Sequence, residues 1–451
     1  MRSLSSIHEA EASPATRLAT SPPVPGVARA GSATADGTLE DAYRAVRRCT
    51  EALCEPLVSE DYVVQSMPDA SPVKWHLAHT AWFFETFLLV PHLPGYRPFH
   101  PQFRVLFNSY YQGVGPCWPR LQRGLLSRPT ATEVFGYRAY VDKHVVCLLR
   151  EAGAEALRQI ATTVILGVHH EQQHQELILT DLKHAWAANP LHPVYREVLL
   201  PEGMPPRRSW LAFPPGLEWI GHEGCGFAFD NESPHHRTWL NGFQLASRLV
   251  TNAEYLAFIS DGGYDRPELW LTDGWVARQT QGWEAPLYWA EHGGEWFITT
   301  LAGLRRLRPD EPVCHVSYYE SDAFARWAGA RLPTEAEWEI AASSVPLGGH
   351  FLEGGHLHPA ASTAADDSGP LYQLYGDVWQ WTASPYIGYP GYRAPAGALG
   401  EYNGKFMCNQ FVLRGASCAT PRSHARKTYR NFFPPDARWQ FSGLRLAKEI
   451  A

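Results

Sequence analysis

The sharpest constraint on the fold is a change of sequence texture near residue 190. Residues 38–190 contain long segments in which apolar residues recur at helical spacing, with one longer connection over 91–128. Four amphipathic segments of this length predict a four-helix bundle. The four segments lie at about 38–57, 71–91, 130–151 and 154–187. The first opens at Thr38 with a start that resembles a capping box, and the second follows Ser71-Pro72, a favourable pair for the N-cap and first position of a helix.

Beyond residue 190, Gly, Pro and aromatic residues become frequent, and only two short helical patterns stand out. One covers 317–328, and the other opens at Thr334, where Glu337 stands at capping-box spacing. We therefore predict an α+β chain in which a mixed, loop-rich domain over 191–451 follows the bundle. Residues 1–37 contain no Phe, Trp or Tyr, and this composition predicts a disordered tail.

Composition excludes several functional classes. The chain has 39 Lys and Arg against 46 Asp and Glu, a net charge of −7, and it shows no basic stripe, which argues against a nucleic-acid partner. No uncharged apolar run approaches the roughly 18 residues that span a bilayer. The 8 cysteines form no CxxC pair and are expected to be reduced thiols. We expect a cytoplasmic protein without membrane contact. The sequence leaves the oligomeric state open.

The most specific local feature is a histidine cluster in the fourth helical segment. His170 and His174 are four residues apart, so both project from one face of a helix. The second segment carries His76 and His79. Because helix bundles build metal sites from facing helices, this arrangement favours a metal site over an incidental pair of solvated histidines.

The same residues allow a second interpretation. His170, Glu171 and His174 also spell HExxH, the zinc-peptidase motif in which Glu171 would be the general base. No third His follows at the metzincin interval, and the downstream region is broken by proline, which argues against a peptidase.

Three neutral imidazoles would leave a divalent ion several open positions. Such a site suits Fe(II), which could take a thiolate, a second substrate's nitrogen and O₂; zinc is the alternative metal.

Both domains resemble one known family. Leu77-Ala78-His79-Thr80, together with the pattern from His170 to Glu176, resembles the DinB-like domain of the sulfoxide synthases of ergothioneine biosynthesis. The second domain resembles the formylglycine-generating-enzyme fold, a C-type-lectin-like architecture. The stretches that carry this second resemblance are Val250–Tyr255, Arg331–Glu339, Gly376–Thr382, Arg414–Ser417 and Gly443–Arg445.

The resemblance implies a reaction and a ligand set. Members of this family use Fe(II) and O₂ to join a thiol sulfur to the imidazole of hercynine, Nα-trimethylhistidine, and to oxidise that sulfur to a sulfoxide. The implied iron ligands are His79, His170 and His174. His76 does not match the motif, and we expect it to pack or cap within the bundle.

A tyrosine pair lies in the long connection of the bundle. Tyr110 and Tyr111 follow the second helical segment, where the mouth of a bundle would meet the second domain. Tyrosines in loops are often packing anchors, but oxygen chemistry needs a donor of a proton or hydrogen atom, and a phenol fits that task. The resemblance is to family members that carry such a pair, so both are candidate catalytic residues.

Hercynine carries a trimethylammonium group, which aromatic faces and acceptor dipoles recognise. The resemblance places Asn431 and Phe432 at the position that contacts this group, with Phe433 beside them. Gln173 is adjacent to His174 and is expected to face the substrate. Ordinary core packing is the alternative for the two phenylalanines.

The thiol donor depends on positions after this Asn-aromatic pair. Family members that accept γ-glutamylcysteine resemble one another in an acid directly after the pair and an Arg four residues later; this chain has Phe433 and Ala437 there. Free cysteine is therefore the expected donor. Arg120 and Arg123 could hold its carboxylate by charge-assisted hydrogen bonds, with surface solvation as the alternative.

Three other functions are consistent with parts of this domain pattern. Formylglycine-generating enzymes use a cysteine pair where this chain has Thr420 and Ala425, and Cys418 stands alone, so that activity is not expected. A selenoneine synthase that uses a seleno-sugar donor would share both domains. A catalytically silent lectin-like binding protein is the alternative from a different functional class.

Overall fold

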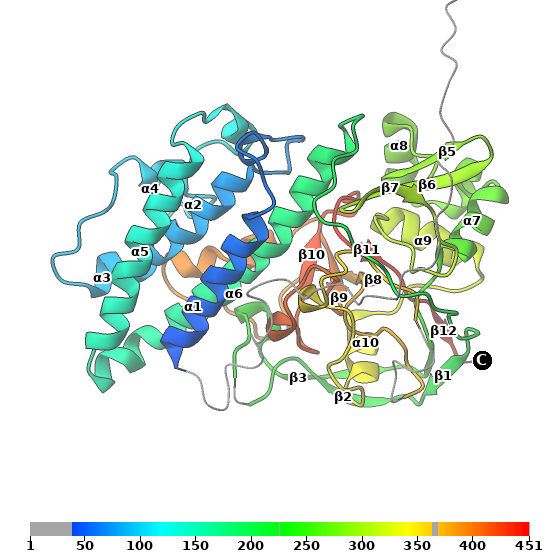
Figure 1. Cartoon of the computed structure of the whole chain (residues 1–451). Coiled ribbons are helices and arrows are strands. Elements are labelled where there is room, and N and C mark those ends of the chain that lie inside the picture. Colours follow the sequence, from blue (N-terminus) through cyan, green and yellow to red (C-terminus); the bar gives the residue numbers. More distant parts are fainter. Residues whose placement is uncertain (1–37, 225, 363–368, 451) are drawn as a thin grey trace, which may run out of the picture.

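The computed structural model describes residues 38–224, 226–362 and 369–450. The predicted disordered tail, 1–37, lies outside the described residues. Within them, a helical amino-terminal part is followed by a part built from small sheets, short helices and loops (Figure 1). The predicted α+β class, with a helix bundle before a mixed, loop-rich domain, is confirmed.

Four long helices form the amino-terminal bundle: α1 (Leu39–Cys54), α2 (Val73–Phe84), α5 (Ala131–Glu151) and α6 (Ala154–Ala187). A π-helical segment, Glu85–Leu89, and the short α3, Val90–His92, prolong α2. Helix α2 packs against both α5 and α6, and α1 packs against α6. Helix α6 also runs along the border with the second domain, so its two sides face different parts of the protein (Figure 1).

The N-cap predicted for α1 is present, whereas the one predicted for α2 is not. Thr38 caps α1 through a capping box with Asp41, as its spacing predicts. Ser71, predicted to cap the second helix, does not: α2 begins at Val73 and has no side-chain cap. The backbone N–H of Ser71 instead donates to Asp181, and its hydroxyl accepts from Arg123. Ser71 therefore makes hydrogen bonds to residues distant in sequence and does not cap the helix.

The long connection between α2 and α5 is ordered by short helical pieces. It contains α4 (Phe103–Leu106) and a 3-10 segment, Arg120–Leu125. The carbonyl oxygens of Arg104 and Leu106 accept hydrogen bonds from the indoles of Trp82 and Trp75 on α2. These bonds hold the connection against the helix that carries His79.

The second domain contains four small sheets and four α-helices among the described residues. One sheet is four-stranded, in the order β10-β9-β8-β11, and only β11 pairs in parallel. Its strands are β8 (Trp379–Pro385), β9 (Phe411–Arg414), β10 (Asn431–Phe433) and β11 (Ser442–Gly443). The other strands are β1 (Trp210–Phe213), β4 (Phe243–Ala246) and β12 (Ala447–Glu449) in one sheet, β2 (Gly216–Ile220) with β3 (His236–Leu240), and β5 (Trp289–His292), β6 (Glu295–Thr300) and β7 (Gly303–Arg306).

Two of the four helices of this domain were not predicted. The predicted helices correspond to α9 (Tyr318–Trp327) and α10 (Glu335–Ala342), and Thr334 caps α10 with Glu337 as expected. The additional helices are α7 (Asn252–Ser260) and α8 (Thr272–Gln281). Thr251 caps α7 through a capping box with Glu254, so this helix has the same local signal as α10, whereas α8 has no side-chain cap. No helix among the described residues is long and apolar enough to cross a membrane.

Candidate metal centre and substrate cavity

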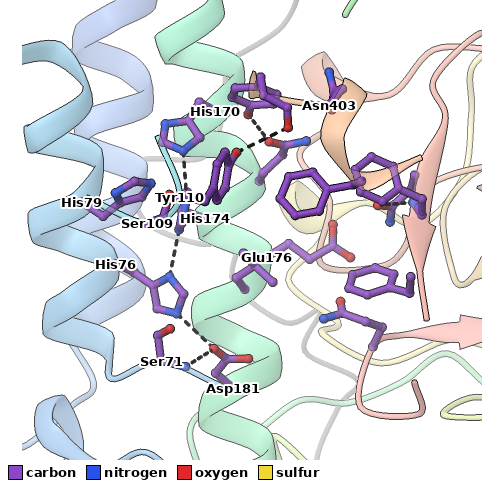
Figure 2. A pocket seen from close by; sticks show the side chains of 18 of the residues that line it. Ser71, His76, His79, Ser109, Tyr110, His170, His174, Glu176, Asp181 and Asn403 are labelled. Carbon is purple, nitrogen blue, oxygen red and sulfur yellow. Dashed lines mark hydrogen bonds and ion pairs between the residues drawn. The ribbon is translucent and has the colours of Figure 1, made fainter. Parts of the chain in front are cut away.

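Three histidines from two helices converge inside the bundle. His79 projects from α2, while His170 and His174 project from α6 (Figure 2). One ligand nitrogen of each lies within 4.8 Å of the others, and all three side chains are buried. The Nε2 atoms of His170 and His174 are 3.1 Å apart. No other cluster of three His, Cys, Asp or Glu side chains among the described residues meets this distance.

In two of these imidazoles, the nitrogen that points away from the cluster, Nδ1, has a hydrogen-bond partner. Nδ1 of His79 lies 2.6 Å from the carbonyl oxygen of Phe107, and its ring stacks on Trp75 with centroids 4.6 Å apart. Nδ1 of His174 lies 2.8 Å from Nδ1 of His76. Hydrogen bonds on the outer nitrogen fix the ring orientation and leave Nε2 for an ion at the centre.

The charge state of the cluster suits a metal ion. Burial lowers the pKa of all three histidines, of His170 to about 3 and of His79 and His174 well below the ordinary value. The three rings are therefore neutral at physiological pH, which is the form that binds metal. Three neutral nitrogen donors in a buried site fit a divalent transition metal.

Glu171 faces away from this cluster. Its carboxylate accepts from Arg47 and Arg138 at 2.8 and 2.9 Å, and it has no exposed surface. Burial alone would raise the pKa of Glu171, but the two guanidinium groups hold it at about 2. A carboxylate bound in this way cannot act as the general base of a zinc peptidase at His170 and His174, so the peptidase alternative loses its base.

The histidines line a cavity of about 380 Å³ between the bundle and the second domain. Its bundle wall is formed by α2, α6 and the long connection, and its other wall by β10 and neighbouring loops. The predicted site residues that line it are His79, His170, His174, Tyr110, Gln173, Arg120, Arg123, Asn431, Phe432 and Phe433. Of the residues predicted for the site, only Tyr111 is not among the lining residues.

The two tyrosines differ in position. Tyr110 borders the cavity beside His170 and His174 (Figure 2), and burial raises the pKa of its phenol. Tyr111 is fully buried behind it, with the two ring centroids 4.6 Å apart, and it packs against Trp82. Tyr110 therefore lies on the cavity wall, whereas Tyr111 is separated from the cavity by its neighbour.

Gln173 connects the two domains at the cavity. Its side-chain amide donates to the hydroxyl of Tyr429 at 2.8 Å and accepts from the hydroxyl of Tyr402. Both tyrosines belong to the second domain and line the cavity. The orientation of the Gln173 amide is therefore fixed by two hydrogen bonds.

Asn431, Phe432 and Phe433 form β10, at the edge of the four-stranded sheet. Phe432 stacks on Tyr386 with ring centroids 4.0 Å apart. Phe433 packs edge-on to Trp439. The two phenylalanines thus combine partial burial with an aromatic surface on the cavity wall.

The two predicted arginines are not equivalent. Arg120 is about half exposed and contacts Asp69. Arg123 is buried, its guanidinium carbon lies 3.4 Å from the ring centroid of Trp75, and its Nη1 donates to Ser71 at 2.8 Å. Burial lowers the pKa of Arg123 to about 9. No carboxylate among the described residues pairs with it.

Sequence reasoning missed several cavity residues. His76, expected only to pack, bridges His174 and Asp181, with its Nε2 3.1 Å from the Asp181 carboxylate. Asp181 lies seven residues after His174, and this spacing of two helical turns could have indicated a shared face. Tyr402 and Tyr429 come from loops of the second domain and left no comparable signal.

Glu176 joins α6 to the second domain. Trp379 Nε1 donates to one carboxylate oxygen at 2.9 Å, Ser417 donates to the same oxygen, and Thr420 donates to the other at 2.8 Å. Burial raises the pKa of Glu176. The position at which formylglycine-generating enzymes would have a cysteine thus holds a threonine that contacts the bundle.

Comparisons with known proteins agree with this architecture. The DinB superfamily matches residues 42–178, and the sulfatase-modifying factor enzyme 1-like domain matches 201–369 and 356–450. The hercynine oxygenase of Mycolicibacterium thermoresistibile is 32% identical over 429 residues, covering 85% of this chain and 88% of that protein. The hercynine oxygenase of Mycolicibacterium smegmatis is 31% identical over 414 residues, covering 86% and 93%. The formylglycine-generating enzyme of Streptomyces coelicolor is 28% identical over 267 residues, covering 50% and 84%.

The extent of these matches separates the two kinds of relative. The formylglycine-generating enzyme covers only half of the chain, whereas the hercynine oxygenases cover most of it and therefore include both domains. The resemblance to sulfoxide synthases that the sequence motifs indicate is confirmed by these relatives. The chain therefore belongs to the hercynine oxygenase family of sulfoxide synthases and is an enzyme of that family.

Proposed function

We propose that this protein is an Fe(II)- and O₂-dependent sulfoxide synthase that joins the sulfur of cysteine to the imidazole ring of hercynine. The observation that carries the proposal is the neutral three-histidine cluster, which opens onto a cavity of about 380 Å³ between the two domains. The reaction converts a thiol, an imidazole C–H and O₂ into a sulfoxide and water. Both organic substrates must therefore meet in one enclosed space.

Iron would be held by Nε2 of His79, His170 and His174. When bound there, Fe(II) supplies redox chemistry with O₂ and a Lewis-acidic centre for the thiolate. The protein's own contribution is to hold the three imidazoles neutral and aligned, through the carbonyl of Phe107 for one ring and through His76 for another.

Hercynine would occupy the side of the cavity formed by the second domain. The faces of Phe432 and its aromatic neighbours suit a trimethylammonium group, which cannot donate a hydrogen bond. Asn431 supplies a polar group on this wall, and Gln173 supplies one from α6 on the bundle wall. Gln173, held by Tyr402 and Tyr429, would orient the imidazole ring toward the metal.

Tyr110 would serve as the proton donor. Its phenol borders the cavity, and the raised pKa keeps it protonated at neutral pH. A protonated phenol beside the reacting atoms can transfer a proton while oxygen is reduced. Tyr111 would support this role by fixing the ring of Tyr110 from behind.

Free cysteine fits the cavity better than γ-glutamylcysteine. The apolar side chain of Phe433 lines the wall where an acid would be needed to pair with a glutamyl ammonium group. Ala437, where an arginine would be needed for the glutamyl carboxylate, is small and buried. Arg123 offers a buried guanidinium for the carboxylate of cysteine itself, and the half-exposed Arg120 lies at the edge of the same wall.

The test is a reconstituted reaction. Protein loaded with Fe(II) without oxygen receives hercynine and cysteine and is then exposed to air, and the products are analysed by mass spectrometry. The expected product is a hercynine–cysteine adduct with one added oxygen atom. Parallel reactions with γ-glutamylcysteine and with a seleno-sugar donor identify the preferred donor. If iron is bound but no cysteine adduct forms, the proposal is wrong.

A further inference from the structure

Two buried charged groups of opposite sign on one wall of the cavity each have a polar atom without a hydrogen-bond partner. Arg123 and Asp181 are each only 5% exposed, and both line the cavity. Nε of Arg123 and Oδ1 of Asp181 have no hydrogen-bond partner among the described residues. Because an unpaired buried charge is costly, such groups normally have a partner of opposite charge. Here the cavity is the place where that partner can bind.

Ser71 separates the two groups. Its hydroxyl accepts from Nη1 of Arg123 at 2.8 Å, and its backbone N–H donates to Oδ2 of Asp181 at 2.8 Å. Figure 2 shows Ser71 and Asp181 together at the end of the cavity below His76. The guanidinium and the carboxylate do not form an ion pair with each other. A ligand that carries an anion and a cation a few atoms apart would satisfy both.

The position of this pair relative to the histidine cluster limits the ligand further. Arg123 stacks on Trp75, which stacks on His79, and Asp181 contacts His76, which contacts His174. The pair is thus only one side chain away from the histidine cluster. An α-amino acid held there by its ammonium and carboxylate groups would have a short side chain directed at the metal.

We propose that Asp181 binds the α-ammonium group of the thiol donor while Arg123 binds its carboxylate, so that the cavity selects a free α-amino acid. This inference rests on the proposed function and gives it a specificity determinant. The trimethylammonium group of hercynine has no N–H to donate to Oδ1 of Asp181. The nitrogen of the cysteine residue in γ-glutamylcysteine is an uncharged amide, which would leave the carboxylate unneutralised.

A ligand series on the wild-type protein tests this without any substitution. Anaerobic calorimetry of the Fe(II)- and hercynine-loaded protein compares L-cysteine with 3-mercaptopropionate, which lacks the ammonium group, and with N-acetyl-L-cysteine. We expect L-cysteine to bind about tenfold or more tightly than either, because each analogue loses a charge-assisted hydrogen bond. Equal affinity of 3-mercaptopropionate and L-cysteine would overturn the inference.

Two variants test whether Asp181 causes the preference for L-cysteine over 3-mercaptopropionate. In Asp181→Asn, the ratio of the two affinities is expected to fall to within about threefold, since the amide carries no charge. His76→Asn is the matched control, because it removes the imidazole that links Asp181 to His174 but keeps the carboxylate; at saturating Fe(II), its ratio should remain that of the wild type. An unchanged ratio in Asp181→Asn, or a loss of hercynine affinity in place of cysteine affinity, would contradict the proposal.

The outcomes also separate this inference from the proposed function. If L-cysteine reacts with hercynine but binds no better than its des-amino analogue, the function stands and the role of Asp181 is wrong. If the iron-loaded wild type binds no cysteine at all, the choice of cysteine as donor fails, and the inference fails with it.

Discussion

Nδ1 of His76 lies 2.8 Å from Nδ1 of His174. The other ring nitrogen of His76 lies 3.1 Å from the Asp181 carboxylate, so a chain of three side chains ends at the outer nitrogen of a candidate metal ligand. The tautomers that satisfy both contacts have His174 donating from Nδ1 to His76 and His76 donating from Nε2 to the carboxylate, which leaves Nε2 of His174 without a proton. Hydrogen-bonded partners of this kind fix the tautomer and the orientation of a ligating histidine.

His76→Asn should weaken iron binding without abolishing it. Removal of such a partner typically costs about 10- to 100-fold in metal affinity, and we expect a loss in this range. The measurement is an anaerobic competition titration with a chelator of known affinity. Thermal unfolding of the metal-free variant serves as the control for a general loss of structure. Wild-type iron affinity in a folded variant would show that His76 only packs.

Gly167→Ala should push α6 away from α2. A Cβ atom at this position would lie 2.4 Å from the ring of Phe84 and 3.1 Å from that of Phe83, which itself packs against His170. We expect a destabilisation of about 1–3 kcal/mol, as for other overpacked cores, together with weaker iron binding. Denaturant unfolding and an iron titration measure the two effects.

Gly136→Ala in α5 is the matched control for this substitution. Gly136 is exposed, and an added Cβ would meet nothing within 4 Å. Because alanine is the better helix former, this change should be neutral or stabilise by up to about 1 kcal/mol. Equal effects of the two substitutions would contradict the close packing of α6 on α2.

Glu171→Gln should destabilise the bundle. The substitution leaves the buried guanidinium groups of Arg47 and Arg138 without their shared anion, and we expect a loss of about 3–5 kcal/mol in the free energy of unfolding. Glu155→Gln, which breaks an exposed ion pair with Arg158, is the control and should change stability by less than about 1 kcal/mol. Urea denaturation measures both.

The same carboxylate predicts a pH dependence. The pKa of Glu171 is lowered from 4.5 to about 2, so its contribution to stability is complete above pH 4.5 and is lost as the pH falls toward 2. The shift corresponds to about 3 kcal/mol. The stability difference between wild type and Glu171→Gln should therefore narrow across this range. A difference that stays constant between pH 5 and pH 2 would contradict the ion pairs.

Tyr110→Phe should retain iron and alter the chemistry. The ring packing remains, but the proton of the phenol is lost, and removal of a positioned acid commonly slows a reaction by at least about 100-fold. The measurement is the ratio of sulfoxide to other oxidised thiol products, with iron content as the control. An unchanged rate and product ratio would reduce Tyr110 to a packing residue.

The sequence was most informative where the signal is local. The capping boxes at Thr38 and Thr334 and the spacing of His170 and His174 each depend on residues within one helical turn, and the structure contains them as expected. The cap predicted at Ser71 failed because its N–H and hydroxyl bond to residues that are distant in sequence.

The cavity could be predicted only in part. Gln173 was found because it neighbours a candidate ligand, but its partners Tyr402 and Tyr429 reach it across more than two hundred residues of sequence. Arg123 Nε and Asp181 Oδ1 lack hydrogen-bond partners because of how the surrounding residues pack. That packing depends on residues distant in sequence, so no local sequence pattern predicts it.

Iron stoichiometry is the most direct test of the central claim that His79, His170 and His174 hold one ferrous ion at the cavity. After anaerobic loading with Fe(II) and removal of free metal, the wild type should retain one iron per chain, and His170→Ala should lose both the iron and the formation of the adduct. A folded His170→Ala protein that keeps stoichiometric iron and wild-type turnover would contradict the account.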